Sequence, residues 1–308
     1  MPFKPLFPCV LALFAPLLSP PAFAQPPLQV VVSILPQQDW VERVGGERVQ
    51  VLTLVQPGDN EATYSPGPAT LAALDGARAW FTLGVHFEMT WLGRITRDRP
   101  GMEVVPLYQG LPLRRVEQGI AAGQPARGHD HDHHHDHAGM PDPHTWTDPR
   151  LAARMVERIA ATLGRLDPAG AAEYTARSRE LQAEMLALHE EIAALLAPVQ
   201  GGTFIVFHPS WGYFADAYGL NQLPIETGGR EPGPRGLAEV IRHGREAGVR
   251  AVFVQQQFSQ RSARAVAEAL GAKVVEADPL ALDYLGNLRE VSMRMAEALG
   301  APGAGSEP

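Results

Sequence analysis

Residues 28–55 read LQVVVSILPQQDWVERVGGERVQVLTLV, and this stretch decides the fold class. Its two ends, 28–34 and 49–55, are short apolar runs rich in valine, which is typical of buried strands. Between them, residues 39–44 follow a helical pattern. A strand, a helix and a second strand in this order form a βα unit, which predicts a mostly parallel sheet.

The same alternation continues along the chain in two series, and about 280 residues after any leader are enough for two lobes with separate cores. Helical patterns at 149–163 and 169–196 separate the two series, and the second predicts one long amphipathic helix. We therefore expect an α/β protein of two βα lobes joined by a long rigid helix: an N-terminal lobe over 25–168, the linking helix over 169–196 and a C-terminal lobe over 197–308. The strand candidates are 28–34, 49–55, 79–84 and 102–107 in the first series, and 203–208, 221–226, 251–257 and 273–278 in the second.

The N-terminus predicts export. Lys4 precedes an apolar run from Phe7 to Leu18, and Ala22-Phe23-Ala24 fits a cleavage site after Ala24, so residues 1–24 are interpreted as a signal peptide. A membrane anchor is the alternative, but prolines interrupt the run. Lipid attachment at Cys9, the only cysteine, is a second alternative. A mature protein in the periplasm would then hold any metal by His, Asp or Glu side chains.

The charge of the chain argues against a nucleic-acid partner. The formal net charge is −8 at pH 7, and loss of Lys4 with the leader would make the mature chain more negative still. No basic stripe offsets this charge, as phosphate binding would require.

Three residues stand where a parallel sheet places its ligands. Ligands gather beyond the carboxyl ends of strands in open α/β sheets, and His208 and Asp278 close two strand candidates of the second series. His144, in the segment PDPHTW, is available from the first lobe. Two imidazoles and a carboxylate suit zinc or manganese. The alternatives are a hydrogen-bonded strand-end histidine for His208 and a helix N-cap for Asp278.

Six further histidines lie in a His-rich loop over residues 128–139. Histidine alternates with aspartate there, between loop-forming flanks, which indicates a solvated segment with weak metal capture or neutral filler as the two interpretations. These accessory candidates are His129, His131, His133, His134, His135 and His137.

Several segments in order resemble the periplasmic zinc- and manganese-binding proteins of ABC transporters. They are VVVSILPQQDWVERVGG, VQPGDNEATYSPGPATL, the His-rich loop, PDPHTWTDP, FIVFHPSWGYFADAYGL, ETGGREPGP and VVEADPLALDYL. The resemblance implies a metal between two lobes, held by three histidines and a carboxylate. Carried over, these are His144, His208, Asp278 and one position in PGDNEATYSPGP.

At that last position the chain departs from the family pattern. Ala62 stands where the resemblance implies the first histidine, and alanine cannot bind a metal. Water, Glu61, His86 or a histidine of the loop could fill the place. Neighbouring side chains of an extended segment point in opposite directions, so Glu61 would point away from the direction that position 62 faces, which argues against Glu61 as the ligand. His86 follows a strand candidate of the first lobe and is preferred.

The resemblance implies a monomeric solute-binding protein that captures a divalent metal and delivers it to a membrane permease, and not an enzyme. Imidazole ligands favour Zn²⁺ over Mn²⁺. Two alternatives stay open. An exported metalloenzyme would use the same two histidines and aspartate with an open coordination position. A metal-dependent adhesin or metal buffer would bind the ion without passing it on.

Overall fold

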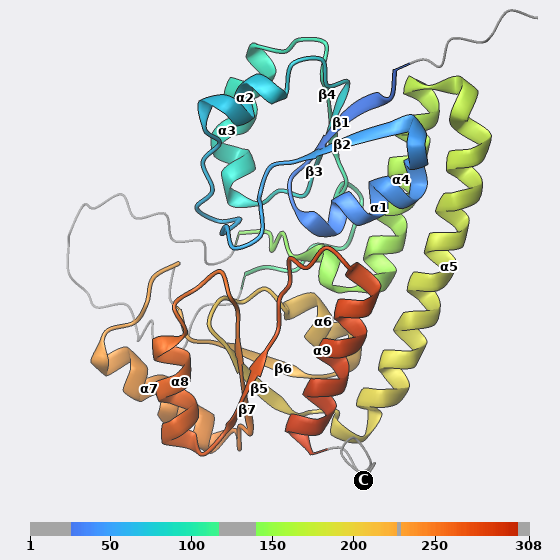
Figure 1. The fold of residues 1–308 in the computed structure, drawn as a ribbon. Coiled ribbons are helices and arrows are strands. Elements are labelled where there is room, and N and C mark those ends of the chain that lie inside the picture. The colour runs from blue at the N-terminus through green and yellow to red at the C-terminus, as the bar shows by residue number, and fades with distance from the viewer. Residues whose placement is uncertain (1–25, 117–139, 227–228, 301–308) are drawn as a thin grey trace, which may run out of the picture.

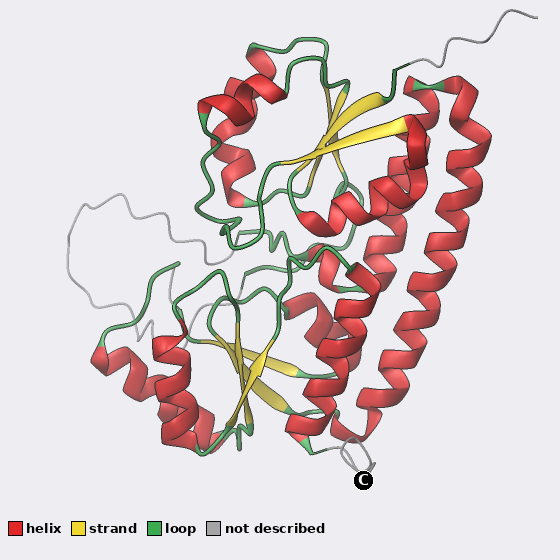
Figure 2. Cartoon of the chain, viewed as in Figure 1, coloured by secondary structure: helices red, strands yellow, loops and turns green. Residues whose placement is uncertain are grey.

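The computed structural model describes residues 26–116, 140–226 and 229–300, and it contains two α/β lobes stacked along one long helix (Figures 1 and 2). The predicted signal peptide and the six histidines of the His-rich loop lie outside the described residues. Within the described ranges, no helix combines the length and apolar character that crossing a bilayer requires.

The first lobe is built on a four-stranded sheet in the order β2-β1-β3-β4, and each of its strand pairs is parallel. The buried valines of β1 form the middle of this sheet. Its elements are β1 (Leu28–Val32), α1 (Leu35–Gly45), β2 (Val49–Thr53), α2 (Pro68–Ala73), β3 (Ala79–Thr82), α3 (His86–Arg97) and β4 (Glu103–Pro106).

The second lobe repeats this topology, because its four strands are also all parallel and take the order β6-β5-β7-β8. The two parallel sheets and the long helix confirm the predicted fold class. The elements are β5 (Thr203–Val206), α6 (Gly212–Tyr218), β6 (Asn221–Pro224), α7 (Pro234–Glu246), β7 (Ala251–Val254), α8 (Gln260–Leu270), β8 (Lys273–Glu276) and α9 (Tyr284–Leu299).

Helix α5 (Ala171–Leu196) runs beside both lobes and packs against α4 (Pro149–Leu166), α1 and α9 (Figure 1). At 1.5 Å per residue it is about 39 Å long. A short 3₁₀ turn at Pro168–Gly170 precedes it, so the helix begins two residues later than the sequence pattern predicted. Its buried positions recur every three or four residues and give it one apolar face. They are Tyr174, Ser178, Leu181, Met185, Leu188, Ile192 and Leu196.

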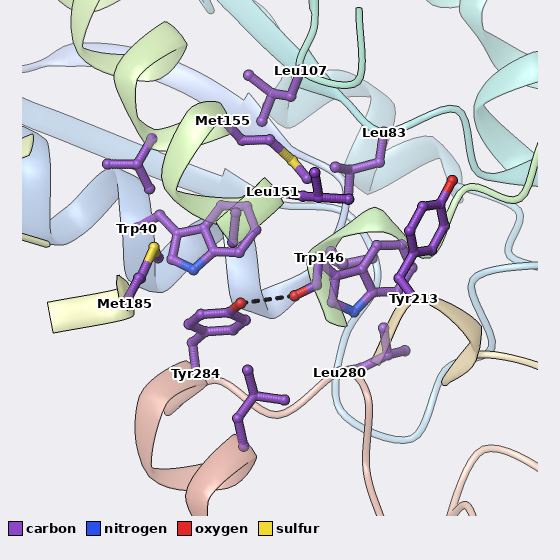
Figure 3. Close-up of a cluster of buried hydrophobic side chains, with 14 of the residues drawn as sticks. Trp40, Leu83, Leu107, Trp146, Leu151, Met155, Met185, Tyr213, Leu280 and Tyr284 are labelled. Atoms are coloured by element: carbon purple, nitrogen blue, oxygen red, sulfur yellow. Dashed lines mark hydrogen bonds between the residues drawn. The ribbon is translucent and has the colours of Figure 1, made fainter. Parts of the chain in front are cut away.

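Buried aromatic side chains join the lobes directly (Figure 3). The indole Nε1 of Trp146 donates to the backbone oxygen of Pro279 at 2.8 Å, and the Tyr284 hydroxyl donates to the backbone oxygen of Trp146 at 2.8 Å. Trp40 of α1 meets the Tyr284 ring edge-on at 5.1 Å. Residues from the first lobe, the connecting segment and α9 therefore share one core, and the lobes are not joined by α5 alone.

All eight predicted strands are present, but each ends one to three residues before the predicted carboxyl end. The TFIVFH strand, for example, ends at Val206 and not at His208. The apolar character of most of these runs continues into the first residues of the following loop, which are buried as well, whereas the run of β7 continues as Gln255-Gln256-Gln257. His208 and Asp278 consequently lie two residues beyond their strands, in loops at the carboxyl edge of the second sheet.

Candidate metal centre

Three side chains from different parts of the chain meet between the lobes. Glu61 comes from the loop after β2, His144 from the segment before α4, and His208 from the loop after β5. The two imidazole Nε2 atoms are 3.2 Å apart. Glu61 Oε1 lies 3.6 Å from Nε2 of His144 and 3.8 Å from Nε2 of His208. One oxygen and two nitrogens thus face a common point.

Each imidazole is held by a carboxylate on its far side. Nδ1 of His144 is 2.7 Å from Oδ1 of Asp142, and Nδ1 of His208 is 2.9 Å from Oε1 of Glu226. Each carboxylate can accept a hydrogen bond from Nδ1–H, and Nε2 of a neutral imidazole then has its lone pair toward the centre. Metal-binding histidines are typically oriented by such a pair.

Local structure fixes both rings further. The backbone N–H of His208 donates to Gln255 Oε1 at 3.2 Å, and its ring stacks on Phe258 with centroids 5.0 Å apart. Thr147 donates from its hydroxyl to the backbone oxygen of His144 at 3.0 Å, within a 3₁₀ turn. The ring of His144 also packs on Trp146. The two imidazoles therefore have little freedom to turn away.

The electrostatics of the centre favour a cation. Glu61 is 2 % exposed, and neither of its oxygens has a hydrogen-bond partner among the described residues. Burial raises the pKa of Glu61, but His144 and His208 outweigh this and hold it below its usual value. Burial would likewise lower the pKa of His144, whereas Asp142 and Glu61 raise it to about 9. A buried carboxylate of this kind requires a positive partner.

The position of Glu61 corrects one expectation. Residues around Glu61 were expected to be extended, which would turn its side chain away from the site. The chain instead makes a tight turn here, because Asn60 Oδ1 accepts the backbone N–H of Ala62 at 2.7 Å and the Thr63 N–H bonds the Asn60 carbonyl. The turn places Glu61 inside and leaves Ala62 partly exposed.

Two predicted ligands lie elsewhere in the described structure. Asp278 binds the side-chain amides of Gln256 and Gln257 and is not among the residues that meet at the centre. His86 is the first residue of α3 and is also outside that group, although it was preferred over Glu61. Ligation by either residue stays a prediction, as does capture by the His-rich loop.

Sequence reasoning missed Asp142 and Glu226. A signal for Glu226 was present, because it closes the strand candidate NQLPIE just as His208 closes TFIVFH, and the same sheet-edge rule applies to both. Asp142 stands two residues before His144, a spacing that permits a side-chain contact only if the chain turns at Pro143. The sequence alone does not show that turn.

The fold and this site define a two-lobed protein with a candidate metal centre between its lobes. Residues 30–298 match the family model described as zinc-uptake complex component A, periplasmic. The chain belongs to this family, which confirms the resemblance seen in its motifs.

Individual relatives agree with the family assignment. The high-affinity zinc uptake system protein ZnuA of Brucella abortus is 29 % identical over 82 % of this chain and 83 % of its own length. The manganese-binding lipoprotein MntA of Halalkalibacterium halodurans is 28 % identical, over 74 % of this chain and 71 % of its own. A crystal structure of ZnuA superimposes with a TM-score of 0.79 and 36 % identity, covering 89 % of this chain and 99 % of the other.

Proposed function

We propose that this protein captures Zn²⁺ in the periplasm and delivers it to the membrane permease of an ABC transporter. Glu61, His144 and His208 would bind the ion. The observation that carries the proposal is the approach of two Nε2 atoms to 3.2 Å beside a buried carboxylate that has no hydrogen bond among the described residues. Two lone pairs and a negative charge repel one another unless a proton or a metal ion lies between them, and a bound Zn²⁺ would replace the proton that the raised pKa of His144 retains there.

The donor set supports zinc in particular. Two imidazole nitrogens and one carboxylate oxygen are ordinary zinc ligands, and three protein ligands leave one tetrahedral position for water or a further group. Imidazole is a softer donor than the oxygen ligands that Mn²⁺ prefers. Mn²⁺ is the second candidate ion, because a relative of similar identity is named for manganese binding.

The remaining parts of the proposal follow from export and family membership. The leader over residues 1–24 would be removed after Ala24, and the mature chain would act as a monomer that carries one tightly bound ion. The centre uses side chains from both lobes, so a permease that separates the lobes would pull Glu61 away from His208. Release would then require no chemical change in the ligands.

Zinc titration of the mature protein in competition with a chelator tests this function. We expect one tight site. Loss of a residue that only supports a metal ligand weakens metal binding by about 10- to 100-fold, and we expect His208→Ala to weaken zinc binding by more than this. His243→Ala is the matched control, because His243 is a partly exposed histidine on α7 and is not among the residues that meet at the centre. Circular dichroism should show both variants folded. Equal affinity of wild type and His208→Ala would contradict the proposal.

A further inference from the structure

The carboxylate that orients His144 is itself held by an arginine. Asp142 Oδ1 faces Nδ1 of His144 and accepts the backbone N–H of the same residue, whereas Asp142 Oδ2 lies 3.7 Å from Nε of Arg114. The side chains of Asp142 and Arg114 are only 4 % and 14 % exposed, so little water screens this ion pair. The imidazole of His144 is therefore the end of a chain of contacts that begins at Arg114.

The backbone also ties Arg114 to Asp142. The two segments that carry them run antiparallel, with a bridge between Arg115 and Pro141. The backbone N–H of Asp142 donates to the backbone oxygen of Arg114 at 2.9 Å. A shift of Arg114 is thus transmitted to Asp142 through the backbone as well as through the side chains.

Helix α6 of the second lobe holds both of these segments. The Tyr213 hydroxyl accepts the backbone N–H of Arg114 at 3.0 Å and donates to the backbone oxygen of Asp142 at 2.9 Å. The Arg114 guanidinium lies over the Tyr213 ring, with Cζ 5.8 Å from the centroid, and Nε is 3.4 Å from Oδ2 of the exposed Asp216. The guanidinium also approaches Gly212, where a Cβ would come within 2.5 Å of Arg114 Cζ. The absence of a side chain at position 212 therefore makes room for Arg114.

We propose that Arg114 and Tyr213 form a brace between the lobes that positions Asp142 and, through it, the imidazole of His144 for zinc. This inference rests on the proposed function and adds two positioning residues to it, neither of which is among the residues that meet at the centre. Without the guanidinium, the buried Asp142 carboxylate loses a cationic neighbour and is free to turn toward other donors. A ring that is fixed before the ion arrives loses less freedom on binding, so the brace strengthens zinc binding.

Zinc affinities measured by chelator competition test the brace. Arg114→Met keeps an unbranched side chain and removes the charge, and we expect zinc affinity to fall about tenfold, the lower end of the range for residues that support a metal ligand. Arg114→Lys keeps the charge and should recover most of the loss. Arg154→Met is the matched control and should bind zinc like wild type, because the exposed Arg154 donates to the backbone oxygen of Gly110 and so fastens the segment before Arg114.

A double-mutant cycle with Asp142→Asn separates positioning of the ring from a general effect on the fold. If Arg114 acts through Asp142, Arg114→Met should lower zinc affinity about tenfold in wild type but less than about twofold in Asp142→Asn, because residues in contact are not additive. The same tenfold loss in both backgrounds overturns the inference. Wild-type zinc affinity of Arg114→Met overturns it as well.

Tyr213→Phe decides the inference if Arg114→Met does not fold, because phenylalanine keeps the buried ring and removes only the hydroxyl. We then expect a loss of zinc affinity of about threefold, a size typical of one hydrogen bond. Unchanged affinity of a folded Tyr213→Phe overturns the inference in that case. Failure of wild type to bind Zn²⁺ tightly would instead refute the proposed function.

Discussion

Glu61 and Asp278 are acidic residues in loops beyond the carboxyl ends of strands, one in each lobe, and their surroundings differ in one respect. Glu61 is buried against two imidazoles, and within the described structure neither of its oxygens accepts a hydrogen bond. Asp278 accepts three hydrogen bonds, two from glutamine amides and one from the backbone. Both carboxylates lie beyond the carboxyl end of a strand, where ligands of parallel sheets are expected, but their oxygens are not equally available to a metal ion.

The comparison shows that hydrogen-bond donors compete with a metal for the same lone pairs. A carboxylate that neutral donors already satisfy must lose those bonds before it binds an ion. A buried carboxylate without hydrogen-bond donors gains a metal bond when the ion enters, and it gives up only its electrostatic contact with protonated His144. Availability of lone pairs, and not proximity to a strand end alone, therefore separates the two residues.

Replacing Glu61 by glutamine should have the largest effect. Glu61→Gln keeps the size of the side chain, removes the negative charge and leaves only a weak oxygen donor, so we expect zinc affinity to fall at least about a hundredfold. Chelator competition measures the loss. Glu276→Gln is the matched control, because Glu276 is exposed at the end of β8. Affinity close to that of wild type would remove Glu61 from the centre and reopen the place for His86.

The carboxylates behind the imidazoles should have the next largest effect. Asp142→Asn and Glu226→Gln each replace a charged acceptor at Nδ1, and we expect each to weaken zinc binding by about 10- to 100-fold. Asp142→Asn should be the more harmful, because Asp142 Oδ1 also accepts the backbone N–H of His144. The dissociation constants of both variants and of Asp98→Asn, at an exposed position after α3, check this order. No loss in either variant would show that the rings need no such support.

The fold could be predicted from the sequence because its signals are local and repeated. Each strand is a continuous apolar run followed by a helical pattern, so the βα alternation and the parallel sheets follow from sequence order. The strand ends could not be placed, since the apolar character of TFIVFH continues through Phe207 although the strand ends at Val206. Burial at the lobe interface, which the sequence does not reveal, extends the run.

The candidate site could be predicted only where strand ends and motifs determine it. His144 and His208 were identified in this way, and the structure brings them together. The inward turn of Glu61 depends on a single side-chain bond from Asn60 to the backbone of Ala62, which no periodicity reveals. The position of the Asp278 side chain depends on two glutamines from the loop after the neighbouring strand β7. The first is a local contact within a turn and the second is a tertiary contact, and both join polar groups that apolar patterns do not encode.

Replacing Asp278 alone should have the smallest effect, which makes it the sharpest test of the comparison with Glu61. Asp278→Asn keeps one oxygen for Gln256 or Gln257, and its new amide can donate to the buried Gln257 Oε1, which otherwise lacks a partner in the described structure. Because this carboxylate is already satisfied within its own loop, we expect zinc affinity to change by less than about threefold, within the range of a surface substitution. The thermal midpoint of the metal-free protein should also stay close to that of wild type. Both variants, Asp278→Asn and Glu61→Gln, are measured in competition with the same chelator. A loss of zinc affinity of similar size in both would show that Asp278 leaves its glutamines to bind the ion, and that the two carboxylates are equivalent.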